Sequence, residues 1–159
     1  MRDFKKLRQG VMKSLPEIQN IKDLELRGKV VEAWALSLSK SSFNRIEETK
    51  GSGGPDTPAM KLGSQSDHLR GVAKLAIAIL DTLEEMFGSL NVDRDTLWAA
   101  GLCHDLGKPF EYDPENRKRW NMDYRISGKP SIRPSCLWST YCFNCRTSRR
   151  NSTCMWRPF

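Results

Sequence analysis

Histidine is scarce in this sequence, with only two among 159 residues, and so are long apolar runs. No stretch approaches the ~20 consecutive apolar residues of a membrane span. The N-terminus, "MRDFKKLRQG", is basic but has no apolar h-region, so we expect no signal peptide and a cytoplasmic location. The length and the 38% hydrophobic fraction are typical of one globular domain.

Acidic residues are absent beyond Asp123, and this absence divides the chain. Seven basic residues follow Asp123, which leaves 19 basic and 19 acidic side chains in residues 1–123. Four of the five cysteines also lie in the terminal stretch 134–159, which has no Ala, Val, Ile, Gly, Asp or Glu. The net charge of +7 therefore belongs to the end of the chain and not to its body.

The body of the chain reads as a series of helices. Residues 3–15 and 20–40 are predicted helices, the second with apolar residues at helical spacing: Leu24, Leu26, Val30, Val31, Trp34, Ala35 and Leu38. We divide the chain into an N-terminal helical extension (1–50), a Gly/Pro-rich loop (51–63), a partial helical domain (64–133) and an aberrant, disordered tail (134–159).

The next predicted helix begins near Ser64 or Ser66, with Asp67 in its first turn, and ends near Phe87 before Gly88. One of its faces carries the residues expected to form a buried stripe: His68, Val72, Leu75 and Ile79. His68 thus stands at the start of the stripe.

A second helix, capped by Asp93, is predicted to reach about Leu106. Its expected inner face holds Leu97, Ala100, Gly101 and His104. Glycine is costly inside a helix, so Gly101 indicates another backbone passing close by.

If these two helices pack antiparallel across their short connection, His68 near the start of one meets His104 and Asp105 near the end of the other. Imidazole nitrogens and a carboxylate oxygen suit divalent Zn, Mn, Fe or Ni. The alternative is that each histidine is a satisfied core residue and Asp105 merely a cap or hydrogen-bond acceptor. Two histidines at matched helix ends with an adjacent aspartate favour the metal site.

"DHLRGVAKLA" followed about 36 residues later by "LCHDLGKP" resembles the HD-domain superfamily of metal-dependent phosphohydrolases, whose pattern is H…HD…D. The resemblance implies an all-α, HD-like helical bundle, incomplete at its C-terminus. It also implies a divalent metal (Mn, Fe, Zn, Ni or Mg) held by His68, His104 and Asp105. Asp105 and Lys108 would be the catalytic residues, and Lys108 would contact substrate phosphate. The alternative, equally weighted, is that Lys108 is a solvated lysine of a loop.

The pattern also requires a later aspartate, and none follows Asp123. Asp113 and Asp123 lie too close to the His-Asp pair, in an expected loop, to supply it. Three of the four ligands are therefore present.

Residues 134–159 allow three interpretations. Cys136, Cys142, Cys145 and Cys154 could form a zinc site, although two CxxC pairs are the usual spacing. The basic, aromatic composition could bind nucleic acid. Read one nucleotide later, however, every Cys codon encodes Val or Ala and every Trp codon Gly. We therefore hypothesise a one-nucleotide insertion, or an equivalent event, near Arg133.

Three functions follow from these readings. The first is a phosphohydrolase acting on a small phosphoester, such as a nucleotide, by metal-activated water. The second is a truncated fragment of such an enzyme with little or no activity. The third, ranked last, is a non-enzymatic protein that binds nucleic acid or zinc through its tail.

Overall fold

The computed structural model describes residues 2–51 and 63–122, and all regular elements in these two ranges are helices. They are α1 (Phe4–Ser14), the 3₁₀ helix η1 (Pro16–Asn20), α2 (Leu24–Ser39), the 3₁₀ helix η2 (Ile46–Glu48), α3 (Gln65–Phe87), α4 (Arg94–Cys103), α5 (Lys108–Tyr112) and α6 (Pro114–Met122). The expected all-α class is confirmed for the described residues. Asp123 and most of the 51–63 loop lie outside the described residues. So do residues 134–159, on which the zinc, nucleic-acid and reading-frame interpretations depend.

Local sequence determines most helix ends. The Asp3, Asp23 and Asp93 side chains accept hydrogen bonds from backbone N–H groups in the first turns of α1, α2 and α4. Ser64 and Asp67 form a reciprocal capping box at the start of α3. Gly88 ends α3 with a φ of 81°, a left-handed conformation that glycine adopts without a Cβ penalty.

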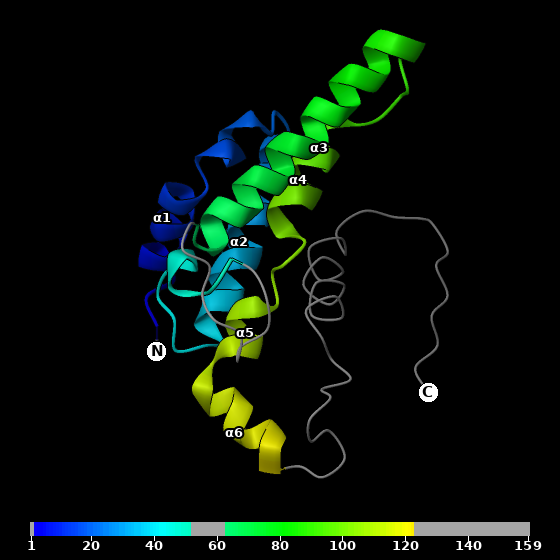
Figure 1. Ribbon diagram of the computed structural model, residues 1–159. Coiled ribbons are helices and arrows are strands. Elements are labelled where there is room, and N and C mark those ends of the chain that lie inside the picture. Colours follow the sequence, from blue (N-terminus) through cyan, green and yellow to red (C-terminus); the bar gives the residue numbers. More distant parts are fainter. Residues whose placement is uncertain (1, 52–62, 123–159) are drawn as a thin grey trace, which may run out of the picture.

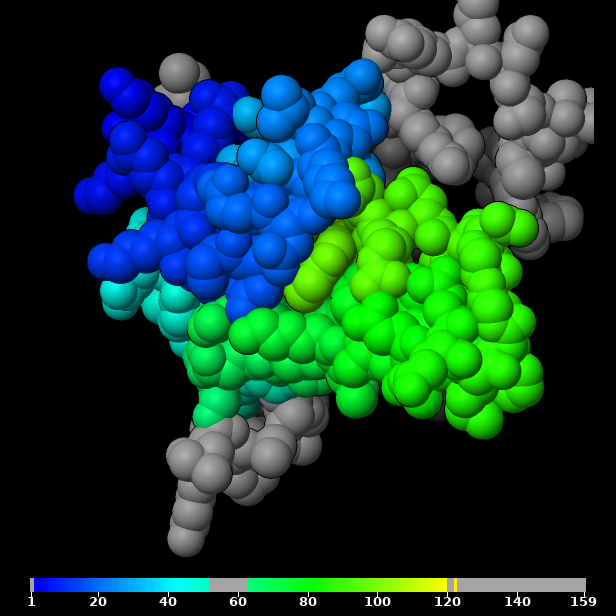
Figure 2. Space-filling model, turned by 90° about the horizontal axis from the view of Figure 1, so that it is seen from above, coloured from blue at the N-terminus to red at the C-terminus, as the bar shows by residue number. Residues whose placement is uncertain are grey.

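The N-terminal helices and the α3–α4 pair share one hydrophobic core. Figure 1 shows α3 and α4 as a long antiparallel pair, and at its lower part α4 packs against α2 and η1 while α3 packs against η2. In Figure 2 the blue N-terminal residues lie directly against the green α3 and α4. The largest fully buried side chain is Trp34 of α2, and its indole Nε1 donates a hydrogen bond of 2.9 Å to the Leu102 carbonyl of α4.

The close approach predicted at Gly101 is confirmed. A Cβ at this position would lie 2.6 Å from the Ala73 Cα of α3, a distance that real Cβ atoms do not show. Gly101 and Ala73 therefore bring the backbones of α3 and α4 together just above the histidine pair.

The predicted inner face of α3 is wrong, because the buried stripe lies on an adjacent face. The structure buries Leu69, Ala73, Ile77 and Leu80 and leaves Leu75 62% and Ile79 52% exposed. Both faces of α3 are apolar, and spacing alone does not distinguish them. The small Ala73 opposite Gly101 determines which face meets α4.

Three smaller expectations are also corrected. Leu24 is exposed at the start of α2, and Ala100 faces outward from α4. α4 ends at Cys103, and a turn joins it to α5. Asp113 is the single non-helical residue that connects the short helices α5 and α6. No helix in the described part of the chain is long and apolar enough to cross a membrane.

Candidate metal centre

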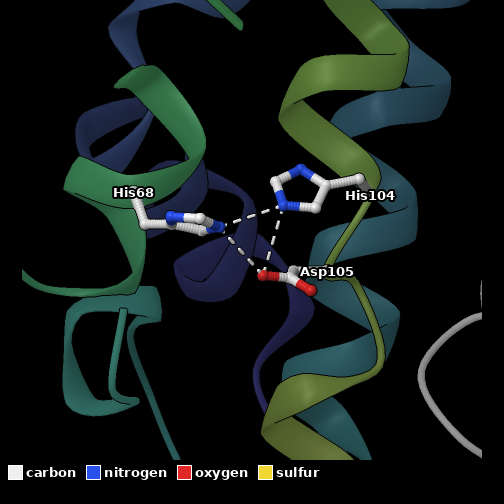
Figure 3. A group of neighbouring side chains, drawn as sticks. All are labelled: His68, His104 and Asp105. Atoms are coloured by element: carbon white, nitrogen blue, oxygen red, sulfur yellow. Dashed lines mark hydrogen bonds and ion pairs between the residues drawn. The ribbon is translucent and has the colours of Figure 1, made fainter. Parts of the chain in front are cut away.

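His68, His104 and Asp105 come together, as the antiparallel packing predicted. His68 extends from the first turns of α3, His104 stands at the C-cap of α4, and Asp105 is the next residue (Figure 3). The two histidine Nε2 atoms are 3.1 Å apart, and each is 3.3 Å from Asp105 Oδ2. All three donor atoms lie within 4.8 Å of one another, a grouping that could hold a metal ion.

The hydrogen bonds around His104 orient its free nitrogen toward this centre. His104 Nδ1 lies 2.8 Å from the Gly101 carbonyl oxygen. Because a carbonyl oxygen only accepts hydrogen bonds, Nδ1 carries the proton, and Nε2 of the neutral ring offers a lone pair. Metal-ligating histidines are commonly oriented by such an Nδ1–H···O=C bond.

The donor set fits a cation. Two ring nitrogens and a carboxylate oxygen all present electron pairs, so their mutual approach to 3.1–3.3 Å is favourable only with a proton or a metal ion between them. Ligands of this kind suit borderline divalent metals. The residues present therefore fit the cation that the sequence pattern implies.

Close polar contacts favour the ionised carboxylate, and burial disfavours two protonated rings. Burial alone would raise the pKa of Asp105, but its contact with His104 and the hydrogen bonds from Lys108 and Gln65 hold it far below its usual value. Burial lowers the pKa of His68, as does the charge of His104. The pKa of His104 is raised by its contact with Asp105. Metal ligands must be deprotonated, and at least one ring and the carboxylate meet this condition.

Lys108 lies at the same centre. Its Nζ is 2.8 Å from Asp105 Oδ2 and 3.4 Å from the Gly51 carbonyl oxygen. The Lys108 side chain is only 12% exposed. It is therefore not a solvated lysine of an open loop. The ammonium group therefore stands beside the three candidate ligands.

Asp113 takes no part in the centre. It is buried between α5 and α6, where its carboxylate accepts hydrogen bonds from the backbone N–H groups of Ser42 and Asn116. Burial by itself raises the pKa of Asp113, and these hydrogen bonds hold it below its usual value. Asp113 joins the segment after α2 to α6.

Gln65 is a contact of the centre that the sequence did not single out. Its side chain reaches both Asp105 and Lys108 from the first residue of α3. A glutamine in the first turn of a helix is unremarkable in sequence. The only signal was its position three residues before His68, on nearly the same side of the helix.

Comparison with known proteins agrees with this geometry. Residues 66–130 match the HD domain family. The resemblance drawn from "DHLRGVAKLA" and "LCHDLGKP" is thereby confirmed. This HD segment begins one residue after Gln65 and contains His68, His104, Asp105 and Lys108.

One relative is the dihydroneopterin 2′,3′-cyclic phosphate phosphodiesterase of Methanocaldococcus jannaschii. It is 36% identical to this chain over 100 residues, which cover 59% of this chain and 39% of the relative. The match thus spans well under half of the relative's length. No solved structure matches the chain.

Proposed function

We propose that this chain is a metal-dependent phosphohydrolase of the HD type, acting on a small phosphoester such as a nucleotide. The observation that carries the proposal is the convergence of two imidazole nitrogens and one carboxylate oxygen on a single point inside the HD segment. The phosphodiesterase activity named for the relative supports a phosphodiester as the first substrate to test.

His68, His104 and Asp105 would hold the cation. A divalent metal bound there supplies Lewis acidity and activates water for attack on phosphorus. The protein's own contribution is to fix the ligands: the Gly101 carbonyl orients His104, and the Asp105 carboxylate stays ionised and faces both rings.

Lys108 would bind a phosphate oxygen. Phosphoryl transfer depends mainly on positioning and on stabilising charge at the equatorial oxygens. The Lys108 ammonium group, next to Asp105, offers a positive charge beside the three candidate ligands. Asp105 and Lys108 would thus serve as the catalytic residues, Asp105 also being a ligand.

The test measures metal binding and substrate turnover on the same protein. The purified chain is assayed for Mn²⁺ and Zn²⁺ binding by calorimetry, and for hydrolysis of bis(p-nitrophenyl) phosphate and a 2′,3′-cyclic nucleotide. Loss of an outer hydrogen-bond partner of a ligand costs about 10–100-fold in metal affinity, so losing a ligand costs more. His68→Ala, His104→Ala and Asp105→Asn should therefore bind metal more than about 100-fold more weakly and lose turnover.

Lys108→Met removes a charge at the substrate and a contact to Asp105, but no ligand. It should still bind metal, about 10–100-fold more weakly at most, and should lose turnover at saturating metal. Glu115→Gln is the matched control, since Glu115 is an exposed carboxylate of α6 that pairs with Lys118. A chain that folds but binds no metal and hydrolyses neither substrate would overturn the proposal and support the inactive fragment. Salt-sensitive nucleic-acid binding in place of hydrolysis would support the third hypothesis.

A further inference from the structure

Gln65 is completely buried, although its side chain is polar, and it lies at the edge of the candidate metal centre. Its Nε2 donates a hydrogen bond of 3.1 Å to Asp105 Oδ2. Its Oε1 accepts one of 3.3 Å from Lys108 Nζ. Each end of the carboxamide therefore contacts one of the two proposed catalytic residues.

The chemistry of these partners determines the orientation of the amide. An ionised carboxylate only accepts hydrogen bonds, and an ammonium group only donates them. The NH₂ group must face Asp105 and the oxygen must face Lys108. The backbone N–H of Gln65 donates to the Thr49 carbonyl at 3.1 Å, which anchors this residue at the start of α3.

We propose that Gln65 is a positioning residue, which holds the Asp105 carboxylate toward the two histidines and the Lys108 ammonium group beside it. This inference rests on the proposed function and extends it to a residue just outside the HD segment. Gln65 acts through its two partners and not on the substrate. Burying a polar group lowers the free energy of unfolding unless the group is hydrogen-bonded. Both the NH₂ group and the oxygen of the Gln65 amide are hydrogen-bonded.

No close substitute performs both tasks. Glutamate would place a second acceptor against Asp105, so the two carboxylates would repel in a buried setting. Methionine has a similar volume but offers neither the donor nor the acceptor. Asparagine is one methylene shorter and does not span from the same backbone position to both partners.

The experiment compares Gln65→Met and Gln65→Glu with the unmodified chain, and uses Gln9→Met and Gln9→Glu as controls because Gln9 is an exposed amide on α1. Metal dissociation constants come from calorimetry with Mn²⁺, and kcat and KM from hydrolysis of bis(p-nitrophenyl) phosphate at saturating metal. Circular dichroism verifies that each variant is folded.

We expect Gln65→Met to weaken Mn²⁺ binding by about 10–100-fold, as for other residues that orient metal ligands. The kcat should remain at least about tenfold lower at saturating metal, because Lys108 is also released. A merely structural role would lower the folded fraction and leave the metal affinity of folded molecules unchanged. Gln65→Glu, which keeps an acceptor for Lys108, should show the larger loss of metal binding.

A second measurement needs neither metal nor activity. In the metal-free chain, the Gln65 side-chain N–H signals should exchange slowly with solvent, and they should shift in Asp105→Asn but not in Glu115→Gln. Gln65 variants that match the unmodified chain within twofold in metal affinity and kcat would overturn the positioning role while leaving the proposed function intact. An unmodified chain that neither binds metal nor hydrolyses substrate would overturn both.

Discussion

The two ends of the α3–α4 hairpin differ in what packs against them. At the proximal end (residues 65–77 and 98–105), α2 and η1 cover the pair, and the candidate metal centre lies here (Figure 1). At the distal end (residues 78–97), the hairpin extends beyond the other helices and exposes several large apolar side chains: Ile79, Leu83, Met86, Phe87, Leu90 and Val92.

This difference shows that the hairpin alone does not build the site. The distal end has the same antiparallel geometry but buries little more than Leu80. The proximal end is held by contacts from outside the pair, such as the hydrogen bond from Trp34 Nε1 of α2 to the Leu102 carbonyl. Functional side chains need such support to hold their geometry.

The largest effect is expected at Trp34, which joins α2 to the proximal end. Trp34→Ala should lower the free energy of unfolding by about 3–5 kcal/mol, because it leaves a large cavity in the core. Trp34→Phe fills most of this volume but leaves the Leu102 carbonyl without its donor, at a cost of about 1–3 kcal/mol. Urea unfolding followed by circular dichroism measures both. Equal stability of the two variants would show that volume is unimportant here.

Within the hairpin, alanine substitutions at two glycines should change the free energy of unfolding by smaller amounts and in opposite directions. Gly101→Ala forces α3 and α4 apart and should cost about 1–3 kcal/mol, partly offset by the better helix propensity of alanine. Gly71→Ala meets nothing within 4 Å and should stabilise the chain by about 0.5–1 kcal/mol. Thermal unfolding and Mn²⁺ calorimetry test the pair, and only Gly101→Ala should also weaken metal binding.

The ion pairs of the two ends should respond differently to pH. Glu17 of η1 is buried and binds Arg70 and Lys74 of proximal α3. Burial alone raises the pKa of Glu17, but the hydrogen bonds from these cations hold it below its usual value. A lowered folded-state pKa gives stability that is present above the unfolded value of about 4.3 and is lost as the pH falls through the folded value.

Glu17→Gln should therefore cost about 1–2 kcal/mol at pH 7 and progressively less as the pH falls below about 4.3. Its distal counterpart is Asp81→Asn, which breaks an exposed pair with Arg94. The distal variant should leave the unfolding midpoint unchanged at every pH, because exposed pairs contribute little. Urea titrations at pH 7, 5, 4 and 3 measure the free energy of unfolding of both variants. If Glu17→Gln lost the same stability at every pH, the ion-pair argument would be contradicted.

The smallest effect is expected on the exposed face of α3. Leu75→Ser should change the free energy of unfolding by less than about 0.5 kcal/mol, since the side chain is mostly in solvent. The matched variant Ile77→Ser, two residues away on the buried stripe, should cost several times more. If Leu75→Ser proved as costly as Ile77→Ser, the face first inferred from spacing would be the buried one after all.

Much of the candidate site could be predicted from the sequence because its signals are local. Ser64, Gly88 and Asp93 mark helix ends through their own side chains or backbone freedom, and two marked helices with a short connection pack antiparallel. The meeting of His68 with His104 follows from that arrangement. The identity of the buried face of α3 could not be predicted, because two apolar faces compete and only the contact of Ala73 with Gly101 selects one.

The sequence by itself determined the helical class, most helix ends and the pairing of the two histidines with Asp105, because caps, periodicity and a His-Asp pair are properties of short stretches. Only the tertiary structure decided that Gln65 and the Gly51 carbonyl reach Lys108. It also decided that Trp34 supports the last turn of α4 and Ser37 the turn after it. These contacts join residues that are 43 to 69 positions apart, and no local pattern records them. The first set is marked by short stretches of sequence, and the second depends on contacts between residues that no such stretch marks.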